Sequence, residues 1–127
     1  MIGFWSALRV ATDWVEIAGK VVEDAVGALP PEIRAVAKAI PILLEEEMPK
    51  HLIDDGWEPD LLGMFDGADV GEEEAGQARI LIFLRNIVDF VEGDTGEFRE
   101  EVRVTLLHEL GHLLGLDEED LVRRGLE

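Results

Sequence analysis

The sequence lacks two side chains that active sites often use, cysteine and tyrosine, and has only one each of serine, asparagine and glutamine. Without cysteine there are no disulfide bonds and no thiolate ligands, so a transition metal must be held by histidine and carboxylate. Because 31% of the residues are charged, the shortage of uncharged polar side chains fits a protein from a hot environment.

Basic residues are scarce. Eleven Lys and Arg face 29 Asp and Glu, which gives a formal net charge of -18. Such a charge opposes binding to phosphate backbones and to anionic lipid, so nucleic acid and membrane surfaces are excluded as expected partners. Basic or neutral ligands remain compatible with this surface.

Long apolar runs are also missing. The amino end has no basic region ahead of its apolar residues, and charged side chains interrupt the sequence before a membrane-spanning length is reached. We therefore expect a cytoplasmic protein. The length predicts a single domain over residues 1–127, with 1–12 as a possible amino-terminal arm and no room for a second, substrate-binding domain.

Two of the three histidines stand in one short motif, His108-Glu109-Leu110-Gly111-His112. On a helix, residues four apart lie on the same face, so His108 and His112 can direct ring nitrogens at one ion. Glu109 is then placed to act as general base on a water molecule at the metal. A plain amphipathic helix is the alternative interpretation of these residues.

The residues after His112 favour the metal site. Gly115 can take a left-handed backbone conformation that ends the helix and turns the chain. Glu118 then becomes available as a third ligand, with the neighbouring Asp117 as its rival. Two histidines and one carboxylate leave a fourth position for water, as in a catalytic zinc site.

The rest of the chain predicts a mixture of helices and short strands. Asp13 with Glu16, and Asp94 with Glu97, have the spacing of helix-capping pairs, and Asn86 with Asp89 suggests a further cap. Buried positions of the motif helix are expected at Phe98, Val102, Thr105 or Leu106, Leu110 and Leu113. The expected helices begin near residues 13, 31, 86 and 94 and after Gly115; the expected strands are 39–46, 61–65 and 78–84, with 48–60 rich in turns.

The chain resembles the small bacterial zincin-like metallopeptidases. The resemblance rests on Leu61 to Gly67, on the strand Arg79 to Leu84, and most specifically on Glu101 to His112. It implies an α+β fold of the minimal zincin type, with a small mixed sheet of about three strands packed on helices that include the motif helix. It also implies His108, His112 and Glu118 as zinc ligands and Glu109 as the base.

Two features depart from larger zincins. No methionine follows Glu118, so the chain is not a metzincin, and no tyrosine is present to stabilise the oxyanion. His51, Arg79 and Arg103 are the candidate substitutes for that tyrosine.

The predicted function is zinc-dependent hydrolysis of a peptide or protein substrate, which strand 78–84 could hold by strand addition. One alternative is a catalytically weak or inactive metal-binding or interaction module with the same fold. Another is a metal-free acidic interaction protein.

Overall fold

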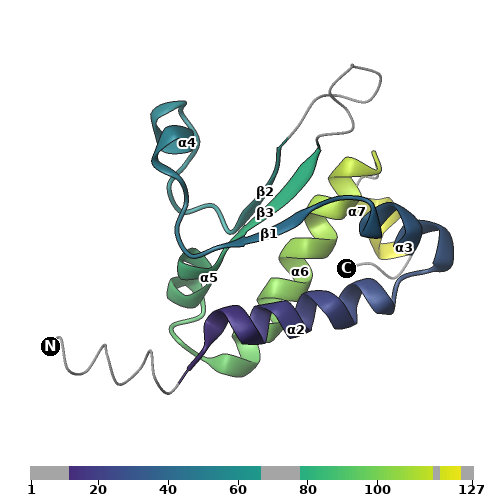
Figure 1. Cartoon of the computed structure of the whole chain (residues 1–127), viewed down its shortest axis with the longest axis horizontal. Helices are drawn as coiled ribbons and strands as arrows, with labels where there is room; N and C mark the ends of the chain where they lie inside the picture. The colour runs from purple at the N-terminus through teal and green to yellow at the C-terminus, as the bar shows by residue number, and fades with distance from the viewer. Residues whose placement is uncertain (1–11, 67–77, 116–117, 124–127) are drawn as a thin grey trace, which may run out of the picture.

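A mixed three-stranded sheet lies at the centre of this computed structural model, which describes residues 12–66, 78–115 and 118–123, without the side chains of Glu118, Leu121 and Val122 (Figure 1). β3 (Arg79–Phe83) is the central strand. β1 (Ile42–Glu45) pairs with it in parallel, and β2 (Gly63–Asp66) pairs with it antiparallel. The expected α+β fold with a small mixed sheet is confirmed.

β3 is buried on both faces, which explains its almost unbroken apolar sequence. Ile80 and Ile82 point toward the helices, whereas Leu81 and Phe83 point to the opposite face of the sheet. Because β1 and β2 occupy both of its edges, β3 cannot pair with a peptide. The prediction that strand 78–84 binds substrate by strand addition is therefore wrong.

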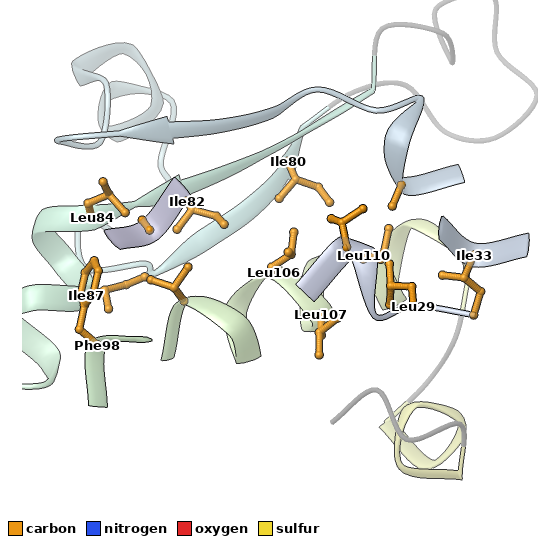
Figure 2. Packing of buried hydrophobic residues seen from close by; sticks show 14 of the residues in the cluster. Leu29, Ile33, Ile80, Ile82, Leu84, Ile87, Phe98, Leu106, Leu107 and Leu110 are labelled. Atoms are coloured by element: carbon orange, nitrogen blue, oxygen red, sulfur yellow. The ribbon is translucent and has the colours of Figure 1, made fainter. Parts of the chain in front are cut away.

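Helices α2 (Trp14–Gly27) and α6 (Thr95–Leu113) cover one face of the sheet, as Figure 1 shows. α3 (Pro31–Lys38) and α5 (Leu84–Phe90) complete the main core. Figure 2 shows Ile80 and Ile82 reaching from the sheet toward the side of α6 that carries Leu106 and Leu110. These side chains are almost fully buried, so α6 is held firmly against the sheet.

The opposite face of the sheet carries a smaller cluster. Met48, and Leu52 of the short helix α4 (Lys50–Asp54), pack there against Met64, Leu81 and Phe83. The sequence predicted only turns in this stretch, because α4 is a single turn or so long and has no side-chain cap on its first residues.

The predicted caps are confirmed at two helices. The Asp13 carboxylate accepts a hydrogen bond from the Glu16 backbone N–H at 3.0 Å, and Asp94 accepts one from Glu97 at 2.8 Å. The predicted cap at Asn86 is wrong, since this residue lies inside α5. Its amide instead donates to the carbonyl oxygens of Pro59 and Leu61, at 2.9 and 2.7 Å.

Within the described ranges, no helix is both long enough and apolar enough to cross a membrane. The predicted amino-terminal arm lies, except for Thr12, outside the described residues.

Candidate metal centre

His108 and His112 lie one turn apart on α6, and their rings are close together. The ring centroids are 4.3 Å apart, and the planes meet at 64°. One donor atom from each of His108, Glu109 and His112 can be chosen so that all three atoms lie within 4.8 Å of one another. The spacing read from the sequence therefore does bring three donors together.

These donors fit a zinc ion. Zinc holds nitrogen and oxygen ligands at about 2.0–2.2 Å, so donors on one tetrahedral ion are roughly 3.5 Å apart. Donor atoms of His108 and His112 lie within 4.8 Å of each other, which is close to that separation. His108 is half-buried and His112 exposed, so the centre opens to solvent and leaves access for water.

Glu109 has a different environment from the two histidines. Its side chain is only 13% exposed, and its Oε1 lies 3.6 Å from Nδ1 of His112. The carboxylate thus lies close to the ring of a candidate ligand while protein covers most of it. The role of general base for Glu109 stays a prediction.

β2 covers Glu109, and Gly63 makes the close approach possible. A Cβ atom added to Gly63 would stand 3.8 Å from Cγ of Glu109, but only 2.6 Å from Cγ2 of Thr105 and 2.9 Å from the carbonyl oxygen of Leu81. No residue other than glycine fits there without movement of the strand. The sequence does contain a signal for this contact, because a glycine inside a strand often marks a place where another part of the backbone approaches closely.

The outer edge of β2 runs beside this centre. The Phe83 N–H donates to the Leu62 carbonyl oxygen at 2.9 Å, so these residues form a hydrogen-bonded pair of the ladder. In an antiparallel ladder such pairs alternate with pairs whose backbone groups point outward. The N–H and C=O groups of Gly63 and Phe65 consequently point away from β3.

The predicted third ligand follows the turn that ends α6. The turn after α6 is as expected, with Gly115 at a φ of 73°. Glu118 is the first residue of α7 (Glu118–Arg123), but its side chain and the whole of Asp117 are outside the described residues. Glu118 therefore remains a predicted ligand.

The three side chains considered as oxyanion donors are directed elsewhere. His51 belongs to α4, whose residue Leu52 packs on the face of the sheet opposite α6. Arg79 shares that face with Leu81. Its guanidinium donates two hydrogen bonds to Asp66, at 3.0 and 2.9 Å.

Arg103 is engaged on α6 itself. Its guanidinium donates to Glu100 at 3.2 and 2.5 Å. These hydrogen bonds raise the pKa of Arg103 and lower the pKa of Glu100. None of the three predicted substitutes for tyrosine is thus aimed at the centre.

Comparison with known proteins finds a family match that includes the residues of the candidate metal centre. Residues 37–126 match the family model described as zincin-like metallopeptidase, a range that extends from the end of α3 through α7. The match covers well over half of the chain and includes His108, Glu109, His112 and Glu118. No curated protein matches the chain.

Proposed function

This chain belongs to the zincin-like metallopeptidase family, and from that premise we propose that it is a zinc-dependent peptidase that uses water to hydrolyse peptide bonds. The observation that carries the proposal is the convergence of His108, His112 and Glu109 beside the outward edge of β2. Two candidate ligands, a nearly buried base and a strand edge that no other described strand pairs with are the parts that such a reaction requires.

His108 and His112 would hold the ion, with Glu118 as the proposed third ligand and Asp117 as its rival. When bound, zinc supplies a Lewis acid that polarises a carbonyl group and acidifies water. Glu109 takes a proton from the attacking water and later delivers it to the leaving amine. The contact with β2 at Gly63 would limit the movement of this carboxylate.

The substrate would be a peptide in an extended conformation. The outward N–H and C=O groups of Gly63 and Phe65 can pair with its backbone as an added strand does. β2 thereby takes the role that the sequence assigned to strand 78–84. Since pairing uses only backbone groups, the edge accepts many sequences, and preference must come from neighbouring side chains.

The test replaces Glu109 by Gln, which keeps the shape of the side chain but removes its basicity. The purified variant should retain zinc, measured by elemental analysis, and lose about 100-fold or more of peptide cleavage, as expected for removal of a general base. Glu101→Gln is the control, because it removes the same charge from the same helix. Equal cleavage of a peptide library by Glu109→Gln and the parent protein would refute the mechanism.

One observation favours a second candidate function. His51, Arg79 and Arg103 are all directed elsewhere, so no side chain among those predicted supports the oxyanion. A zincin fold of this kind can serve as a metal-binding or interaction module, in which the ion chiefly stabilises the fold. Such a module would lose thermal stability on chelation, while a diverse peptide library stays uncut by the zinc-loaded protein.

A further inference from the structure

We propose that a cavity at the start of β2 is a subsite that selects a basic side chain, lysine or arginine, in the bound peptide. The cavity has a volume of about 270 Å³, and its walls are Asp60, Leu62, Asn86, Asp89 and Phe90. We call it the Phe90 cavity. The assignment of a substrate residue to it rests on the peptide-binding role proposed for the edge of β2.

The Phe90 cavity adjoins the outward edge of β2. Leu62 lines it and immediately precedes Gly63, the residue that packs against Thr105 and lies next to Glu109. A peptide paired with the outward groups of Gly63 would therefore pass the mouth of the cavity within a residue or so. The opposite wall comes from α5, which directly follows β3.

Hydrogen bonds from Asn86 hold together the wall between β2 and α5. The Asn86 side chain donates to two carbonyl oxygens, those of Pro59 and Leu61. These bonds tie the chain ahead of β2 to α5 and use both amide hydrogens of Asn86. This part of the lining is thus fixed by contacts within the protein.

One part of the lining is apolar. Phe90 is 65% exposed, a large fraction for a phenylalanine, and Leu62 is half-buried beside it. The aliphatic stem of lysine or arginine can cover such surface while the charged end remains solvated. A cation near the face of Phe90 gains a further attraction from the ring.

The other part of the lining is negatively charged. Within the described part of the chain, the Asp60 and Asp89 carboxylates make no ion pair and no hydrogen bond. Arg85, on the same helix as Asp89, is paired with Glu47 at 3.1 Å. The two carboxylates are therefore left to attract a cation from outside.

The combination of an apolar and a negatively charged lining favours a basic side chain over other ligands. A calcium ion needs six to eight oxygen ligands, and Leu62 and Phe90 supply none from their side chains. An acidic side chain would be repelled by Asp60 and Asp89. An uncharged apolar side chain gains the contact with Phe90 but not the charge interaction, so it should bind less well than lysine.

The experiment measures peptide binding to the zinc-loaded Glu109→Gln protein, so that peptides are not consumed. Blocked short peptides that differ only in one lysine, norleucine or glutamate are titrated by NMR. We expect lysine to bind on the order of five-fold more tightly than norleucine for each carboxylate engaged, with shifts at the amides of Asn86 and Phe90. Asp89→Asn should lower that preference about five-fold, whereas Asp55→Asn, an exposed control directly after α4, should leave it unchanged.

Three results would overturn the subsite: equal binding of lysine and norleucine peptides, a preference that survives Asp60→Asn combined with Asp89→Asn, or no peptide binding at millimolar concentration. Cleavage by the parent protein is measured separately. Lysine-dependent binding without any cleavage would reject the peptidase and keep the subsite, so the two proposals fail independently.

Discussion

The motif helix carries three near neighbours, His108, Glu109 and His112, whose side chains differ in their exposure to solvent. His112 is exposed, His108 is half-buried, and Glu109 is largely covered by β2. This difference suits their proposed tasks, because ligands must be open to the ion while a base works best at a fixed position. The i, i+4 spacing decides only which side chains share a face.

Asp94 is the residue that sets where the motif helix begins. Replacing it by Ala removes the hydrogen bond to the Glu97 N–H and should lower the free energy of unfolding by about 1 kcal/mol, measured by urea denaturation. Asp13→Ala removes the equivalent bond from α2 and serves as the matched control. If Asp13→Ala lowers the free energy of unfolding and Asp94→Ala does not, Asp94 does not stabilise the start of α6 as a cap.

At the scale of elements, the contact between β2 and α6 assembles the candidate site. It brings the outward edge of a strand next to the helix that carries the donors, and it does so at a glycine. The two elements are joined through β3, on which β2 pairs and α6 packs. The site is therefore a product of strand pairing as much as of the motif.

Replacing Gly63 by Ala tests that contact. The added methyl group meets Thr105 and the Leu81 carbonyl, so the strand must shift, and we expect a loss of about 1–3 kcal/mol in the free energy of unfolding. Cleavage should fall because Glu109 loses its cover, while zinc content is retained. Calorimetry, elemental analysis and turnover of the best library peptide measure these effects.

Two further variants complete the test. Thr105→Ser removes the Cγ2 atom that the new methyl group meets, so the double variant should recover part of the stability and turnover. Gly19→Ala in α2 has open space around it and should be neutral or stabilising by up to about 1 kcal/mol. No recovery in the double variant would show that Thr105 does not limit the approach of β2.

At the scale of the whole molecule, the carboxyl-terminal segment is the part that would close the metal site. The left-handed turn at Gly115 ends the motif helix and leads into α7. The proposed third ligand, Glu118, begins that helix. Two helices would then share one ion, so metal binding and the docking of α7 would depend on each other.

Glu118→Gln and Asp117→Asn decide between the two candidate ligands. Loss of a first ligand should weaken zinc binding by more than the roughly 10–100-fold that loss of an outer-shell partner causes, measured by competition with a chelator. We expect this for Glu118→Gln, with a much smaller effect of Asp117→Asn. The reverse order would assign the ligand to Asp117, and two small effects would exclude both.

The motif helix, its cap at Asp94, the turn at Gly115 and the buried central strand could all be predicted from the amino-acid sequence alone. All of these depend on local spacing, which helix and strand geometry translate directly into position. The packing of distant segments places Glu109 under Gly63, engages Arg79 elsewhere, and leaves the Asp89 carboxylate without an ion pair or hydrogen bond among the residues that the structure describes. Those outcomes depend on packing between segments that are distant in the chain, which no local pattern encodes.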